Sequence, residues 1–225
     1  MFYYNEDGEK IVDSEKLECM NTCGATSNIY RLSKTKILKT YLEPVSNTNR
    51  IDKNLFEILQ NINSEYMVKI YELLKNNPSN ELIDGYIAKY YKPYSIDILT
   101  DDVNYILDNI RYIEILFDCL AGYGIRVDDV KPDNSILQKN KIILIDPDSY
   151  EFVNCSLDSI KKMNKKTLHK FICSLFIKKM IINRIPVNKI QMLKMEIESD
   201  SEVSYQLSKK FKTYKRALDY FNSRK

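Results

Sequence analysis

Acidic side chains gather in one stretch of this 225-residue sequence, GIRVDDVKPDNSILQKNKIILIDPDSYEF, which covers residues 124–152. Asp129 and Asp146 stand at the ends of apolar runs, where a solvated surface charge is not usually placed, and Asn134 lies between them. Carboxylate and amide oxygens are suitable ligands for Mg2+, and a carboxylate can also orient an attacking hydroxyl. The residue types therefore indicate phosphoryl transfer, which needs metal ions held against phosphates and a carboxylate near the nucleophile.

The elements expected before this stretch are mostly strands. Short β-favouring runs separated by turn residues predict three strands, and helical spacing of apolar residues predicts one helix after them. Two further strand candidates follow, split by a polar loop. These elements are expected at residues 16–20, 28–32 and 36–41, then 47–62 (helix), 66–74 and 85–91.

The pattern turns helical after residues 92–97, KPYSID, which we interpret as a hinge because proline restricts its own backbone and that of its neighbour. A helical stripe then precedes the acidic stretch, in which two short strands are expected, and further helices follow. The stripe is Ile106, Ile110, Ile113, Phe117 and Leu120, the strands cover 134–137 and 141–146, and the later helices cover 164–182 and about 203–221. This order predicts an α+β chain of two lobes, residues 1–91 and 92–225.

The acidic stretch resembles the catalytic and metal-binding loops of the protein kinase superfamily. The motif H-R-D-L-K-P-x-N of that family is matched by V-D-D-V-K-P-D-N at residues 127–134, and its D-F-G is matched by D-P-D at residues 146–148. The resemblance covers roughly residues 15–180. It implies a bilobal protein kinase-like fold with an N-terminal antiparallel sheet and one helix, and a mostly helical C-terminal lobe.

Roles for five residues follow from this resemblance. Asp129 would be the catalytic base, and Lys131 would lie close to the transferred phosphate and offset its charge. Asn134 and Asp146 would hold magnesium, and Asp148 would add a further metal-directed carboxylate. A lysine and a proline after the catalytic aspartate look more like the serine/threonine protein kinases than like the antibiotic or choline kinases.

The glycine-rich loop of the family falls on residues 22–29, TCGATSNI. Only its middle glycine is present, as Gly24, the position where the backbone approaches phosphate most closely. The resemblance assigns Thr22, Gly24, Ser27 and Ile29 to nucleotide binding. Small residues here would let the loop cover a nucleotide through its N–H groups.

The remaining nucleotide-binding residues are expected on the strands and the helix of the first lobe. Lys39 would contact the α and β phosphates, and it would form an ion pair with Glu57 on the helix that follows. Ala88 would lie at the back of the adenine pocket. Backbone groups from Lys89 to Tyr91 would face the edge of the adenine.

Departures from the family occur on both sides of Asp129. Val127 and Asp128 replace histidine and arginine, so an arginine that could receive an activation-loop phosphate is absent from this motif. Pro147 and Asp148 replace phenylalanine and glycine, and no A-P-E motif follows. The activation segment is therefore expected to be reduced, and how a peptide would dock is left open.

Charge and composition limit the cellular compartment and the kinds of partner that are expected for this protein. Residues 161–225 carry 17 Lys and Arg against 5 Asp and Glu, so basic C-terminal helices are candidates to bind an acidic partner. No signal peptide or membrane-spanning run is found, which predicts a cytoplasmic protein without a membrane partner. We do not expect nucleic acid as the partner, because lysine-rich helix faces are more often simply solvated.

The sequence thus predicts a kinase that uses ATP with Mg2+ (or Mn2+) and transfers the γ-phosphate to a hydroxyl, most simply a serine or threonine of an unidentified protein. One alternative is a pseudokinase, a nucleotide-binding or empty interaction module, which the eroded glycine loop favours. Another is a small-molecule kinase, which would need no peptide platform. Dependence of turnover on Asp129 separates the first two hypotheses, and the identity of the acceptor separates the first from the third.

Overall fold

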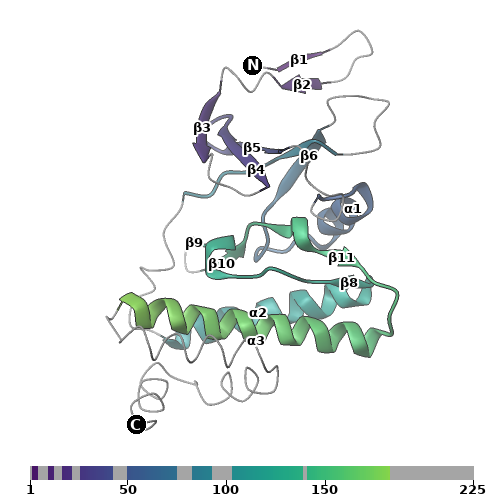
Figure 1. Ribbon diagram of the computed structural model, residues 1–225, viewed down its shortest axis with the longest axis vertical. Coiled ribbons are helices and arrows are strands. Elements are labelled where there is room, and N and C mark those ends of the chain that lie inside the picture. Colours follow the sequence, from purple (N-terminus) through teal and green to yellow (C-terminus); the bar gives the residue numbers. More distant parts are fainter. Residues whose placement is uncertain are drawn as a thin grey trace. The chain divides into compact units, whose positions relative to one another are not determined.

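The computed structural model describes most of the first 182 residues and has an α+β architecture (Figure 1). The described residues are 2–4, 10–12, 17–21, 26–42, 50–74, 83–92, 103–138 and 141–182. The predicted α+β class is confirmed. No helix among these residues is both long enough and apolar enough to cross a membrane.

The chain separates into two compact units. One contains Met1–Lys92 together with Pro147–Ser149, and the other contains Pro93–Asp146 and Tyr150–Lys225. A short 3-10 helix, η5 (Pro147–Ser149), is thus grouped with the N-terminal residues although it follows the acidic hairpin in sequence. This grouping brings Asp148 among residues that precede it by a hundred positions.

The first unit is built on a five-stranded antiparallel sheet in the order β3-β4-β5-β7-β6. A separate two-stranded hairpin at the N-terminus was not predicted from the sequence. The sheet strands are β3 (Glu18–Asn21), β4 (Ser27–Arg31), β5 (Lys36–Tyr41), β6 (Ile70–Leu74) and β7 (Gly85–Lys89); the hairpin strands are β1 (Phe2–Tyr4) and β2 (Lys10–Val12).

The side chains of strand β5 alternate between an apolar face of the sheet and a face that carries polar groups. Leu38 is fully buried and packs with Leu74 and Ile87 in an apolar cluster. Successive side chains of a strand point to opposite faces, so Lys39 and Tyr41 share the face that Leu38 does not occupy. Both of these residues are nevertheless buried, which means that their polar atoms need partners inside the protein.

Helix α1 (Lys53–Ile62) begins six residues later than the predicted range because Asp52 caps it. The Leu55 N–H donates to the Asp52 side chain over 2.7 Å, the usual arrangement of an aspartate N-cap. Asn63 ends the helix in the left-handed conformation, at φ 44°, and donates its N–H to the Leu59 carbonyl. The buried face of the helix consists of Leu55 and Leu59.

The second unit contains two long helices that lie side by side, with two short antiparallel strand pairs (Figure 1). Its helices are α2 (Val103–Gly122) and α3 (Leu157–Ile182). Its strand pairs are β8 (Ile125–Arg126) with β11 (Glu151–Phe152), and β9 (Ser135–Gln138) with β10 (Lys141–Leu144); a 3-10 helix, η4, covers Pro132–Asn134.

Helix α3 begins at Leu157, whereas the sequence predicted a start at Asn164. Ser156 accounts for the difference, because its hydroxyl accepts from the Ser159 N–H over 3.3 Å and Ile160 is buried in the first turns. The predicted apolar stripe on α2 is confirmed at the four positions whose side chains are described. The buried residues are Ile110, Ile113, Phe117 and Leu120. The predicted hinge after Lys92 and the helix at 203–221 lie outside the described residues.

Gly85 on β7 lies against the backbone of β5 and offers a test of the β5–β7 pairing. A Cβ atom at Gly85 would lie 2.2 Å from the Lys39 carbonyl oxygen, so the two strands would have to separate. We expect Gly85→Ala to lower the free energy of unfolding by about 1–3 kcal/mol or more in urea titrations.

Gly122→Ala is the matched control for this prediction. A Cβ atom at Gly122 would meet nothing within 4 Å, and alanine is the better helix former. We expect this variant to be neutral or stabilised by less than about 1 kcal/mol. Equal stability of the two variants would show that β5 and β7 do not approach each other this closely.

Candidate functional site

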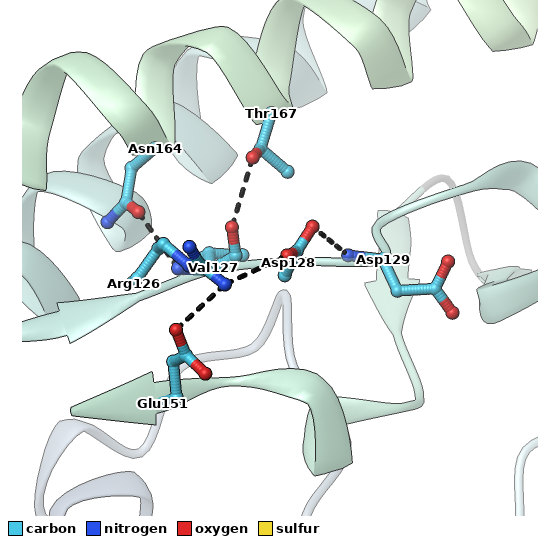
Figure 2. A network of polar contacts seen from close by, with 7 residues as sticks. All are labelled: Arg126, Val127, Asp128, Asp129, Glu151, Asn164 and Thr167. Atoms are coloured by element: carbon cyan, nitrogen blue, oxygen red, sulfur yellow. Dashed lines mark hydrogen bonds and ion pairs between the residues drawn. The ribbon is translucent and has the colours of Figure 1, made fainter. Parts of the chain in front are cut away.

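Asp129 has an unusual backbone conformation for a residue other than glycine. Its φ is 49°, in the left-handed region that most side chains avoid. Two hydrogen bonds hold it there: its N–H donates to the Asp128 carboxylate over 2.9 Å (Figure 2), and its carbonyl accepts from Asn134 Nδ2 over 3.0 Å. Such strain persists only where surrounding contacts determine the conformation, and it is concentrated at functional sites in proteins.

The Asp129 carboxylate contacts the side chains of the two other residues that were predicted to act with it. Lys131 Nζ lies 2.9 and 2.8 Å from its two oxygens, and Asn134 Nδ2 donates to Oδ2 over 2.9 Å. The Asp129 and Lys131 side chains remain about half exposed, at 49% and 48%, so this ion pair adds little to stability. The structure therefore brings Asp129, Lys131 and Asn134 together in a solvent-accessible cluster.

The β9–β10 hairpin adds Asp146 to this neighbourhood. Ser135 pairs with Leu144 at the open end of the hairpin, and the Ile145 N–H donates to the Asn134 carbonyl over 3.0 Å. Asp146 is the next residue after this last bond. The hairpin thus explains why an asparagine and an aspartate twelve positions apart in the sequence lie on neighbouring chain segments.

The donor set in this neighbourhood fits a hard divalent cation. Asn134 uses its amide nitrogen on Asp129, while its side-chain oxygen makes no hydrogen bond within the described residues. No group of three His, Cys, Asp or Glu side chains able to hold a metal is found in the part of the chain that the structure describes. A cation here would take the Asn134 oxygen, one or two carboxylates, and its other ligands from phosphate and water, as Mg2+ commonly does.

Tyr150 is a neutral neighbour of Asp146 in the second unit. Its side chain is buried, and burial together with the charge of Asp146 raises the pKa of its phenol. The phenol therefore stays protonated at any working pH.

Asn164 fixes the start of the Asp129 loop from inside α3. Its side-chain oxygen accepts from the Val127 N–H over 2.8 Å (Figure 2), and its amide nitrogen donates to the carbonyls of Phe117 and Ile125, each over 3.1 Å. Thr167, one turn further along α3, donates to the Val127 carbonyl over 3.0 Å. Asn164 is thus bonded at once to α2, β8 and the loop.

A second buried asparagine, Asn109 on α2, supports the hairpin. Its side-chain oxygen accepts from the Ile142 N–H over 2.9 Å and so holds the outer edge of β10. Sequence reasoning missed both asparagines. The available signal was a polar amide within an apolar helical stretch, since such a group needs buried partners.

Arg126 links the two strands next to the loop. It lies opposite Glu151 in the β8–β11 pair, and its guanidinium forms ion pairs with Glu151 at 2.7 Å and with Asp128 at 3.3 Å (Figure 2). Asp128 therefore contacts both this arginine and the Asp129 N–H. The family motif has an arginine where this chain has Asp128. Arg126, two positions earlier, does lie beside the loop, but it is already paired with the carboxylates of Asp128 and Glu151.

Lys39 has a different partner from the one predicted. Its Nζ lies 2.6 Å from Asp148 Oδ2, with both side chains less than a tenth exposed. Glu57 pairs instead with Lys53, one helical turn earlier, at 3.8 Å, and its side chain is 57% exposed. The predicted Lys39–Glu57 pair is therefore wrong, because Glu57 lies away from the buried face of α1.

Tyr41 completes the environment of Asp148 in the first unit. Its hydroxyl donates to Asp148 Oδ1 over 3.0 Å and accepts from the Ile51 N–H over 3.1 Å, with all of these atoms buried. Burial, and then the charge of Asp148, raise the pKa of Tyr41, so the phenol remains a donor. The Arg50 guanidinium lies 5.3 Å from the centre of the Tyr41 ring.

The predicted nucleotide-binding residues are only partly described. Thr22 and Gly24 lie outside the described residues, whereas Ser27 and Ile29 are on β4, with Ser27 buried. Ala88 is fully buried on β7. Ser27, Ile29 and Ala88 therefore belong to the same sheet as Lys39.

Two backbone donors of the expected adenine edge are already used. The N–H groups of Lys89 and Tyr90 donate to the carbonyls of Lys69 and Thr35, each over 2.8 Å. These two N–H groups are therefore used within the chain, and the contribution of the other backbone groups of this segment to adenine binding stays a prediction. Tyr91 is buried, and the Lys89 ammonium lies 5.1 Å from the centre of its ring.

Comparison with known proteins adds no family to these observations. Neither a protein-family model nor a curated protein matches this sequence.

The three hydrogen bonds of Asn164 predict a large effect on stability. Asn164→Ala would remove three buried hydrogen bonds, to the Val127 N–H and to the carbonyls of Phe117 and Ile125, and we expect a loss on the order of 3 kcal/mol in the free energy of unfolding. Urea titration monitored by circular dichroism measures it. Asn154→Ala, at an exposed asparagine before α3, is the control and should change stability by less than about 0.5 kcal/mol. Similar values for both variants would rule out Asn164 as the anchor of the loop.

Proposed function

We propose that this protein is a phosphotransferase with a bilobal protein kinase-like fold, which moves the γ-phosphate of ATP to a hydroxyl with the help of Mg2+ or Mn2+. The observation that carries the proposal is the convergence of Lys131 and Asn134 on the strained Asp129, with Asp146 following the last hydrogen bond of the neighbouring hairpin. Phosphoryl transfer needs these group types near one another, and it needs little else from the protein.

Asp129 is the proposed base for the acceptor hydroxyl. In the structure its carboxylate carries the Lys131 ammonium on both oxygens. An incoming hydroxyl would donate to this carboxylate, while Lys131, on a flexible side chain, would turn toward the transferred phosphate and offset its charge. Asn134 would keep the carboxylate in place through Nδ2 during this exchange.

Asn134 and Asp146, in the second unit, are proposed metal ligands, and Asp148, in the first unit, is proposed as a further metal-directed carboxylate. Their oxygens match the preference of Mg2+, and the side-chain oxygen of Asn134 has no hydrogen bond within the described residues. When bound, the metal would neutralise the charge of the nucleotide phosphates. Lys39, which Asp148 holds in the buried pair, would contact the α and β phosphates.

The acceptor is proposed to be serine or threonine of a protein. Lys131 and Pro132 support this assignment through the resemblance to serine/threonine protein kinases. The connection from Asp146 to α3, which begins at Leu157, is short and leaves little chain for a peptide platform. This favours a small molecule as the alternative acceptor in the same reaction.

A nucleotide-binding module without transfer is the second candidate. The observation in its favour is the position of Glu57, which is exposed and pairs with Lys53 instead of with Lys39.

Transfer of label from γ-labelled ATP tests the proposal. With Mg2+ or Mn2+, the purified protein should label itself or a basic protein acceptor, and Asp129→Asn and Asp146→Asn should each lower the rate by about a hundredfold or more. Asp118→Asn, at an exposed carboxylate on α2, is the matched control and should keep the wild-type rate.

The other outcomes separate the candidates. Nucleotide that raises the melting temperature without any labelling of protein or small-molecule hydroxyls would favour the binding module. Absence of both labelling and nucleotide binding would exclude the enzyme. Labelling that survives Asp129→Asn would remove Asp129 from the role of base.

A further inference from the structure

The Asp148 carboxylate is held by two side chains of one strand. Lys39 Nζ lies 2.6 Å from Oδ2 and the Tyr41 hydroxyl donates to Oδ1 over 3.0 Å. Lys39 and Tyr41 are two residues apart on β5 and therefore lie on the same face of the sheet. Each oxygen of Asp148 thus has its own partner from β5.

The Tyr41 hydroxyl is itself fixed in direction. Its oxygen accepts from the Ile51 N–H over 3.1 Å, so its single proton is left for an acceptor, and Asp148 Oδ1 is the acceptor within reach. The ring is buried, and it packs edge-on against Tyr86 with the ring centres 6.3 Å apart. The phenol is therefore a donor in a fixed position.

We propose that Tyr41 is a positioning residue that keeps the Asp148 carboxylate oriented for a divalent cation, an inference that rests on the proposed function. If Lys39 turns to the nucleotide phosphates, its ammonium leaves Oδ2, and the cation would take its place there. The Tyr41 hydroxyl would still hold Oδ1, so the carboxylate would neither rotate nor need a new partner. A carboxylate pre-oriented in this way loses less conformational entropy when it binds a metal.

Tyr41→Phe tests this role because it removes only the hydroxyl and keeps the buried ring. We measure free Mn2+ by electron paramagnetic resonance while titrating the protein with a non-hydrolysable ATP analogue present. The half-saturating Mn2+ concentration should rise about tenfold or more, as expected for the loss of a hydrogen bond to a charged group. At saturating Mn2+, the transfer rate should return to near the wild-type value.

Tyr30→Phe is the matched control. Tyr30 lies on β4 of the same sheet, and its hydroxyl accepts from Asn28 Nδ2 over 3.4 Å, without contact to Asp148. We expect its Mn2+ titration to overlay that of the wild type. A purely structural role of Tyr41 would lower the melting temperature but leave the Mn2+ titration of the folded protein unchanged.

A double-mutant cycle shows whether Tyr41 acts through Asp148. In an Asp148→Asn background, Tyr41→Phe should raise the half-saturating Mn2+ concentration by less than about twofold, because the carboxylate that Tyr41 positions is gone. The same large increase in both backgrounds would overturn the proposed route.

The wild-type titration separates failure of this inference from failure of the proposed function. If the wild type binds Mn2+ with the nucleotide and Tyr41→Phe binds it equally well, the role of Tyr41 is excluded and the phosphotransferase stands. If the wild type binds neither Mn2+ nor the nucleotide analogue, both proposals are excluded.

Discussion

The hydrogen bonds of the buried Asn164 amide are the interaction on which the loop that carries Asp129 depends. Strand β8 has only two residues, so the backbone groups around it have few ladder partners, and buried polar groups without partners are costly. One side chain on α3 bonds to the Val127 N–H and the Ile125 carbonyl, and it also donates to the Phe117 carbonyl of α2. The loop that follows can then adopt the strained conformation of Asp129, because its start is fixed on a helix.

A second constraint operates in the first unit, where an ammonium group is buried. A charge removed from water needs a close countercharge and further hydrogen bonds. Asp148 provides the countercharge for Lys39, and Tyr41 occupies the other carboxylate oxygen. Surface charges such as Glu57 and Lys53 carry no such requirement, which is why a neighbour one helical turn away suffices for them.

The elements were predictable where local patterns decide them. The strands around Ile29 and Leu38, the apolar face of α2 and the β9–β10 hairpin agree with the sequence pattern, since burial repeats with the period of the element. The start of α3 was misplaced because Ser156 caps the helix before its apolar run begins. Grouping of Asp129, Lys131 and Asn134 was expected from the resemblance, and the structure adds their distances.

The sequence by itself determined the α+β class, the order of the elements and the acidic residues that could take part in chemistry, because these depend on side-chain type and on short spacings. Tertiary structure alone decided which buried group meets which. Asp148 contacts Lys39 and Tyr41, which precede it by more than a hundred residues. Asn164 on α3 contacts Val127, which follows strand β8. Such pairings follow from the requirement that every buried polar group find a partner, and the sequence does not state which partner the fold brings within reach.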